Sequence, residues 1–137
     1  MFLIDTDILS ALRKRKRHPE IAQWVERQRS ADLHLSVVSV GEIERGIVRQ
    51  LRRDPEHAHE LSAWLDSLLM LHRERILAVD LSAARRWGRL SGLLGHESAD
   101  LLIAATALEH GLTVVTRNVR HFEPAGVPVL DPSSAAC

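Results

Sequence analysis

The chain has 137 residues, of which 45% are hydrophobic and 26% are charged, and its formal net charge is zero. These values fit one globular domain, exclude an intrinsically disordered chain and give little support to a general polyanion binder. No apolar run approaches the roughly 20 residues that span a bilayer, and the N-terminus lacks the pattern of a signal peptide. Because the only cysteine is Cys137, no disulfide can form within the chain, and we expect a cytoplasmic protein without a membrane segment.

Short apolar segments predict four or five strands. The first, Phe2-Leu3-Ile4, is wholly apolar, and residues 33–38 alternate before they become apolar. Further apolar runs cover residues 76–79, 113–116 and 127–130. Pro128 restricts the last run to an edge of the sheet, because proline has no N–H group for a central ladder.

Helical patterns fill the segments between the strands, and the first two helices are predicted at residues 8–14 and 19–29. Residues that favour N-cap positions predict where the later helices begin. Ser39 is followed by Glu42 three residues on, and Asp54 directly precedes Pro55. Either Asp80 or Ser82 caps the next helix, and Ser98 caps the last. The last long helix, residues 100–110, is apolar nearly all round, so we expect it to be buried. Gly111 ends it.

The alternation of strands and helices predicts an α/β fold in which helices cover both faces of a parallel sheet. No internal repeat or linker interrupts the pattern. We therefore expect a single domain over residues 1–131, followed by a short, frayed tail over residues 132–137.

Three acids follow predicted strands or begin predicted helices. Asp5 directly follows the first strand, Glu42 lies near the start of the helix after the second, and Asp100 lies near the start of the buried helix. In a parallel sheet such points meet at the carboxyl edge, where ligands bind. Mg²⁺ and Mn²⁺ prefer carboxylate oxygens, and such an ion activates water and neutralises charge on a phosphoryl group. The three acids therefore predict a divalent metal site.

Each acid also has a purely structural explanation. Glu42 would complete a capping box with Ser39, and Asp100 would complement the dipole of its helix. Asp5 is harder to explain in this way, since a carboxylate that ends an apolar strand needs a partner. For Asp7 we favour the N-cap of the first helix over metal binding.

Basic residues are clustered at residues 13–17, which are all cations and are extended by His18, and again at Arg49, Arg52 and Arg53. A basic rim around an acidic metal site would suit a phosphodiester substrate. The plainer interpretation of each cluster is a solvated helix end, and the sequence leaves both interpretations open.

Four segments resemble motifs of PIN-domain proteins, and especially of the VapC-like toxins of bacterial toxin–antitoxin pairs. They are, in chain order, residues 2–10 (FLIDTDILS), 39–46 (SVGEIERG), 99–107 (ADLLIAATA) and 111–118 (GLTVVTRN). The segments follow the family's order and spacing over nearly the whole chain. Such a resemblance implies a three-layer α/β/α sandwich with a central, mainly parallel sheet.

The resemblance also implies an endoribonuclease that depends on Mg²⁺ or Mn²⁺ and acts as the toxin of such a pair. By position, Asp5, Glu42 and Asp100 would be the metal ligands, with Thr6 and Thr116 as hydrogen-bonding residues beside them. RNA would be the substrate, a cognate antitoxin would block the site, and the toxin would form a homodimer. The apolar helix around Trp64 would be either buried or part of a groove for a second subunit or the antitoxin.

Two departures from the family pattern affect the predicted site. Asn118 stands where many relatives have a fourth acid, and His121 where many have an aspartate. Asparagine can orient a metal-bound water or ligate through its carbonyl, but it adds no charge, so we expect one well-held metal and lower activity. Asp7, where asparagine is common, adds a negative charge that would offset part of this loss. Arg117 is expected to contact either a substrate phosphate or an acid.

Two other functions are alternatives to the nuclease. A phosphoacceptor receiver domain is also small and doubly wound, but it needs a lysine near its last site strand, and the only lysines here are Lys14 and Lys16. A catalytically weak or silent PIN domain that binds protein or RNA is favoured by Asn118. Productive binding of Mg²⁺ would distinguish the active enzyme from the silent domain.

Overall fold

The computed structural model describes residues 1–134 and confirms the predicted α/β fold with five strands. The strands are β1 (Phe2–Ile4), β2 (Leu33–Ser36), β3 (Ile76–Leu77), β4 (Thr113–Val115) and β5 (Val129–Leu130). They form one sheet in the order β3-β2-β1-β4-β5, and each neighbouring pair is parallel. In the centre, Phe2 pairs with Leu33 on one side and with Thr113 on the other.

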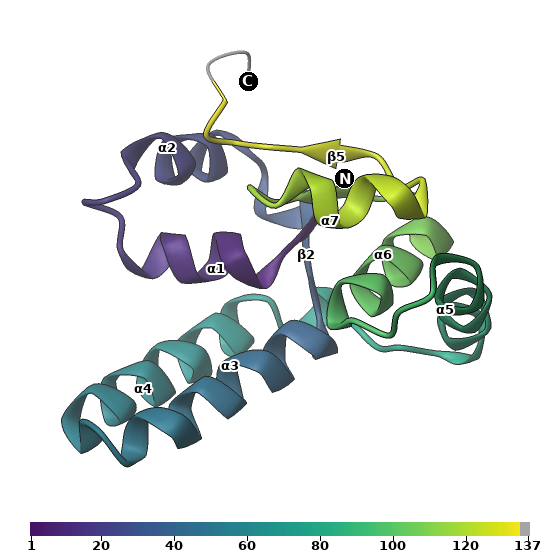
Figure 1. The fold of residues 1–137 in the computed structure, drawn as a ribbon. Helices are drawn as coiled ribbons and strands as arrows, with labels where there is room; N and C mark the ends of the chain where they lie inside the picture. Colours follow the sequence, from purple (N-terminus) through teal and green to yellow (C-terminus); the bar gives the residue numbers. More distant parts are fainter. Residues whose placement is uncertain (135–137) are drawn as a thin grey trace.

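Helices cover both faces of the sheet, as predicted (Figure 1). One face packs against α1 (Thr6–Arg13), α2 (Pro19–Arg27), α3 (Val37–Leu51) and α4 (Pro55–Leu71). The other packs against α5 (Leu81–Leu94), α6 (Ala99–His110) and α7 (Val119–Phe122). Single 3₁₀ turns lie at Ser30–Asp32, Arg73–Arg75 and Glu123–Ala125. None of these helices has both the length and the apolar character that a bilayer span requires.

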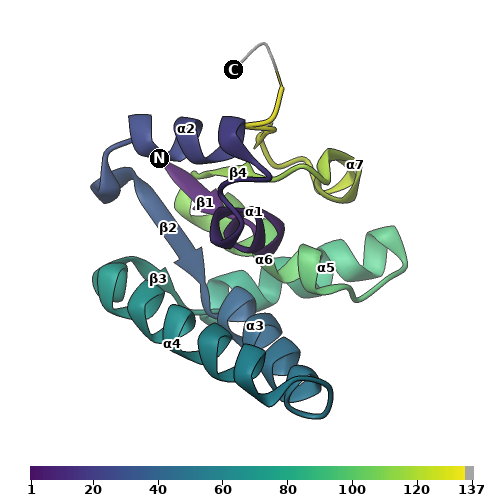
Figure 2. The same ribbon diagram turned by 90° about the vertical axis from the view of Figure 1, so that its left-hand side faces the viewer.

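The alternation of side chains along the strands divides the core into two layers. In β1, Leu3 joins the layer under α5 to α7, whereas Ile4 joins the layer under α1 to α4. Val114 and Val115 of β4 divide in the same way. Both faces of these two strands are therefore buried, which explains why they are apolar at every position except Thr113 at the start of β4. Figure 2 shows α3 and α4 running side by side as a pair.

The start of α3 corrects one sequence prediction. The N-cap is Ser36, whose Oγ accepts a hydrogen bond from the Val38 N–H at 3.0 Å, and not Ser39. Val37 and Val38 are β-branched and therefore extend the strand pattern in the sequence. The hydrogen bond from Val38 to the Ser36 cap nevertheless places both valines in the first turn of α3. The predicted strand over residues 33–38 is shorter as a result, and Glu42 lies beyond the first turn with no capping box.

Ser98 occupies the N-cap position of α6 as predicted, although its side chain makes no capping hydrogen bond, and two further predicted caps are confirmed by their hydrogen bonds. Asp54 accepts a hydrogen bond from the His57 N–H, and Asp80 accepts one from the Ala83 N–H, which decides between Asp80 and Ser82. Gly111 ends α6 with a φ of 65°, a left-handed conformation that favours glycine. The buried position of α6 is also confirmed, since residues 103–107 are all inaccessible to solvent. Of the predicted tail, residues 135–137 lie outside the described residues.

The cap at Ser36 generates a stability prediction. Ser36→Ala removes the oxygen that satisfies the Val38 N–H, and we expect it to lower the free energy of unfolding by about 1 kcal/mol. Ser82→Ala, an exposed serine in the first turn of α5 that does not cap, should leave it within roughly 0.5 kcal/mol. Urea unfolding of both variants checks this, and equal midpoints would contradict the assignment of Ser36.

Candidate active site

The strand order reverses direction at β1, and this is where the predicted site residues meet. From β1 the chain moves outward to β2 and β3, and then returns to place β4 on the other side of β1. Asp5 directly follows β1, Thr116 directly follows β4, and the Asp5 N–H donates to the Val115 carbonyl at 3.0 Å. Ligands of open α/β sheets bind in the crevice at such a switch point.

Asp5 is a buried carboxylate, with only 3% of the residue exposed. Its Oδ1 accepts a hydrogen bond from the Thr6 N–H and its Oδ2 accepts one from the Thr116 hydroxyl, both at 2.8 Å. Burial, together with the nearby carboxylates of Asp100 and Asp7, nevertheless raises the pKa of Asp5 from 3.8 to about 6. Its ionised form is therefore short of compensating positive charge.

Asp100 lies in the first turn of α6, as predicted, and its charge acts on Asp5. Its Oδ2 is 3.0 Å from Nδ1 of His121, which lies on α7. The Asp100 side chain is 27% exposed and that of His121 is 61% exposed. A partly exposed carboxylate thus lies beside a buried one, with a histidine at the solvent side.

Glu42 is connected to the same edge through Thr6. The Thr6 hydroxyl donates to Oε1 of Glu42 at 2.7 Å and lies 2.8 Å from Oγ of the buried Ser39. Oε2 of Glu42 is 4.0 Å from the Arg45 guanidinium. Thr6 therefore makes hydrogen bonds beside Glu42, as the sequence predicted. Ser39 also belongs to this hydrogen-bonded group, although the sequence suggested it only as a helix cap.

Asp7 does not cap α1, which corrects the prediction for that residue. Asp5 holds the N-cap position, because its own carboxylate already accepts the Thr6 N–H. Asp7 instead pairs with Arg117, whose Nη2, Nε and backbone N–H donate to it at 2.6, 3.0 and 3.2 Å. Of the two partners expected for Arg117, the structure thus has the acid. No sequence signal links residues that lie 110 positions apart.

Thr116 and Asn118 complete the edge beside β4. The Thr116 hydroxyl donates to Asp5 and accepts a hydrogen bond from the Asn118 N–H at 2.9 Å, so its rotamer is held from both sides. Asn118 is exposed and precedes α7, but its side chain does not cap that helix. Its amide is therefore free of any capping role at the edge of the site.

The donor chemistry of this edge fits a hard divalent cation. Across residues 1–134 the structure brings no three His, Cys, Asp or Glu side chains together as a ready-made metal cluster. It does bring together two electrostatically coupled carboxylates, Asp5 and Asp100. Mg²⁺ is commonly held by one or two carboxylates and keeps several waters, so such a pair is a suitable donor set.

Comparison with known proteins gives a consistent family assignment. The family model for the PIN domain matches residues 2–127. Plasmid stability protein StbB of Pseudomonas syringae pv. tomato is 32% identical, over 98% of this chain and 100% of that protein. VapC ribonuclease Y4jK of Sinorhizobium fredii is 31% identical, over 96% of this chain and 97% of that protein.

Solved structures agree over the same length. The crystal structure of FitAcB from Neisseria gonorrhoeae superposes with a TM-score of 0.85 at 31% identity, over 96% of this chain and 98% of that one. A toxin-antitoxin complex from Klebsiella pneumoniae superposes with a TM-score of 0.70 at 26% identity, again over 96% of this chain and 98% of that one.

The raised pKa of Asp5 predicts how stability depends on pH in the absence of metal. Between about pH 4 and pH 6 the folded state binds the Asp5 proton more tightly than the unfolded state does, so stability falls as the pH rises through this range. Asp5→Asn removes this cost and should raise the free energy of unfolding at pH 7 by on the order of 2 kcal/mol.

Urea unfolding in EDTA at several pH values from 4 to 7 measures the effect. The stability difference between Asp5→Asn and the wild type should shrink to near zero at pH 4. Asp66→Asn, an exposed aspartate on α4, is the matched control and should change neither the stability nor its slope with pH. A wild-type protein as stable as Asp5→Asn at pH 7 would contradict the prediction.

Proposed function

The chain belongs to the PIN domain family, and we propose that it is the ribonuclease toxin of a toxin–antitoxin pair, which hydrolyses RNA phosphodiesters with a divalent cation. The observation that supports this most strongly is the buried carboxylate of Asp5, which is coupled to Asp100 at the switch point of the sheet. The similarity to VapC ribonuclease Y4jK over nearly the full length of both chains supports ribonuclease activity.

In this proposal Asp5 and Asp100 bind Mg²⁺ or Mn²⁺, and Glu42 completes the acidic set. A bound cation would supply a nucleophilic water and would neutralise charge on the phosphoryl group, so no covalent nucleophile is needed. Thr116 orients Asp5, and Thr6 orients Glu42, through the hydrogen bonds described above. The amino end of α6 carries a partial positive charge, which complements an acidic side chain such as Asp100 in the first turn.

Asn118 and His121 set the exposed side of the site. Asn118 lies next to Thr116 and can orient a water through its amide, but it contributes no charge. His121 already contacts Asp100 and must share that carboxylate with a metal ion. Both features favour one cation over two.

The proposed partners are a cognate antitoxin and a second copy of this chain. The superposition with a toxin-antitoxin complex supports the antitoxin. A cleft of about 570 Å³ between α1, α2 and α4 is lined by apolar side chains that include Leu12, Val25, Trp64, Leu68 and Leu71. This cleft suits the apolar face of a partner helix, and it contains the tryptophan that the sequence suggested for a groove.

A catalytically silent PIN domain is the second candidate. The neutral Asn118 favours it because it adds no charge for a cation, and His121 favours it because it already contacts an oxygen of Asp100. A silent domain would bind its partner protein or RNA without cutting RNA in the presence of Mg²⁺ or Mn²⁺.

Cleavage of a mixed RNA pool by the purified chain tests the proposal. We expect cuts with Mg²⁺ or Mn²⁺ and none with EDTA. Asp5→Asn and Asp100→Asn should each lower the rate by at least about a hundredfold while the proteins remain folded, because each removes a charged ligand. Asp66→Asn should cut like the wild type. Full activity in either site variant would refute the assignment, and a wild type that never cuts would favour the silent domain.

Asn118→Asp tests the effect of the missing acid. A fourth carboxylate at the exposed edge should tighten Mn²⁺ binding by roughly tenfold, since it adds a negative charge beside the site. Isothermal titration with Mn²⁺ on wild type and variant measures this. Unchanged affinity would show that residue 118 lies outside the metal's reach.

A further inference from the structure

Arginines on α3 form a surface that the proposed chemistry at Asp5 does not use. On the basis of the proposed ribonuclease function, we propose that the RNA strand on one side of the cleaved bond runs along the cleft between α1 and α3, where Arg49 and Arg53 bind its backbone phosphates. The inference specifies a substrate path and two binding residues outside the acidic site.

The cleft starts at the candidate active site. It has a volume of about 350 Å³ and is lined by Thr6 and Glu42, the hydrogen-bonded pair described above. From there it is bordered by Arg13 and Lys14 at the end of α1 and by Gly46 and Gln50 on α3, with His57, Leu61 and Trp64 of α4 at its base. Because α1 and α3 both begin at the carboxyl edge of the sheet, the cleft leads away from the acids.

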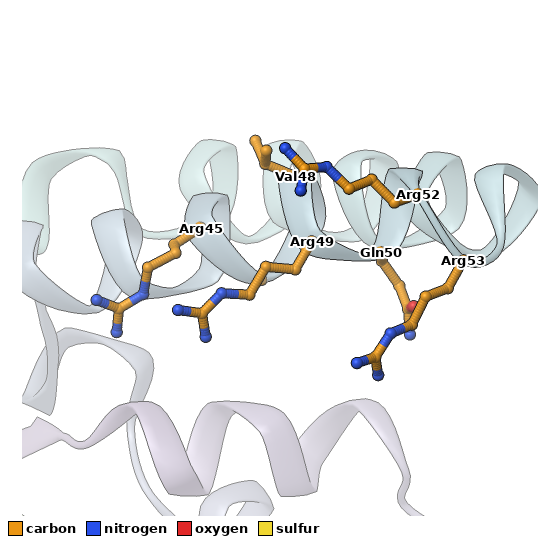
Figure 3. Close-up of a pocket in the computed structure, with 7 residues that line it drawn as sticks. Arg45, Val48, Arg49, Gln50, Arg52 and Arg53 are labelled. Carbon is orange, nitrogen blue, oxygen red and sulfur yellow. The ribbon is translucent and has the colours of Figure 1, made fainter.

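The cleft continues into a second, larger hollow on α3. This hollow, of about 920 Å³, shares Gly46 and Gln50 with the first and is otherwise lined by Arg45, Val48, Arg49, Arg52 and Arg53. In Figure 3, Arg45, Arg49 and Arg53 point to the same side of α3, the side on which α1 lies, whereas Arg52 lies on the other side. We call these three residues the arginine row.

The spacing of the arginine row suits a nucleic-acid backbone. Arg45 and Arg49, four apart on α3, lie on one face of the helix and are separated by about 6 Å along its axis. Arg53 follows in the turn after Leu51, where α3 ends. The separation of Arg45 and Arg49 is close to that of successive phosphates in an extended single strand. A guanidinium group can donate two parallel hydrogen bonds to one phosphate, so the row offers a series of phosphate sites.

The charges of this row are available for a ligand. Arg49 and Arg53 are exposed, and within the described residues neither has an ion-pair partner. Arg45 alone lies near an acid, Glu42, at 4.0 Å. Although the net charge of the whole chain is zero, the cleft and the arginine-lined hollow together form a basic track, which starts beside the acidic site.

The lining of this track favours RNA over an acidic protein segment. A peptide helix needs apolar anchors, and the arginine-lined hollow offers only Val48. Most apolar side chains line the neighbouring cleft between α1, α2 and α4, to which we assigned the antitoxin; it shares Arg13 and Trp64 with the first cleft but no residue with the arginine-lined hollow. The two surfaces thus differ in the chemistry of the ligand that they suit.

Steady-state cleavage of a long single-stranded RNA by the double variant Arg49→Gln/Arg53→Gln tests the path. We expect KM to rise roughly tenfold or more at low salt and kcat to stay unchanged, because the acids are intact. The slope of log KM against log salt should fall by about 1.4, since each phosphate contact on a single strand contributes about 0.7. The matched control is Arg85→Gln/Arg89→Gln, two exposed arginines with the same spacing on α5, across the sheet; it should behave as the wild type.

A short RNA that spans only the cleaved bond provides a second readout. It does not reach Arg49 and Arg53, so its KM should be the same for the wild type and the double variant. A rise in KM for this short RNA as well would indicate general damage to the site and would overturn the proposal. An unchanged KM and salt slope for the long RNA would overturn it also.

Binding of labelled single-stranded RNA in EDTA separates the failure of this path from the failure of the proposed function. If the wild type cuts RNA and the double variant binds RNA equally well, the path is wrong and the nuclease stands. If the wild type cuts nothing but loses RNA affinity in the double variant, the nuclease fails and the path stands. Poly-glutamate that competes as well as RNA would overturn the assignment to RNA.

Discussion

The burial of one carboxylate at the end of a central strand is the constraint on which the rest of this structure depends. Asp5 is almost inaccessible, and two hydrogen bonds from Thr6 and Thr116 do not compensate its charge, as the raised pKa near 6 shows. The fold tolerates this cost because both faces and both neighbours of β1 are fully packed. A buried carboxylate whose ionisation costs this much free energy is typical of a functional site and not of a stabilising contact.

Much of the fold follows from local sequence, because local interactions decide it. The two-sided burial of β1 and β4 explains their apolar residues, and Asp54, Asp80 and Gly111 mark helix ends through short-range chemistry. The start of α3 could not be predicted in this way. Val37 and Val38 favour a strand by themselves, and only the cap from the buried Ser36 places them in a helix.

The placement of three acids near one edge of the sheet was predictable from the sequence, but the contacts of their side chains were not. The positions of Asp5, Glu42 and Asp100 follow from topology, since parallel strands bring their carboxyl ends to one edge. Side-chain direction depends on tertiary partners, so the contacts of Glu42 with Thr6 and of Asp100 with His121 required coordinates. The pairing of Asp7 with Arg117 was missed for the same reason, and the assignment of the acids as metal ligands stays a proposal.

The position of β1 has a consequence for the nascent chain. It precedes the other four strands in the chain, yet one of its neighbours, β4, begins only at Thr113. Until then Asp5 lacks the Thr116 hydroxyl, and one edge of β1 remains unpaired. A translation product that ends before β4 therefore contains Asp5, Glu42 and Asp100 but not the enclosure around Asp5, so the site is assembled only after Thr116 has been synthesised.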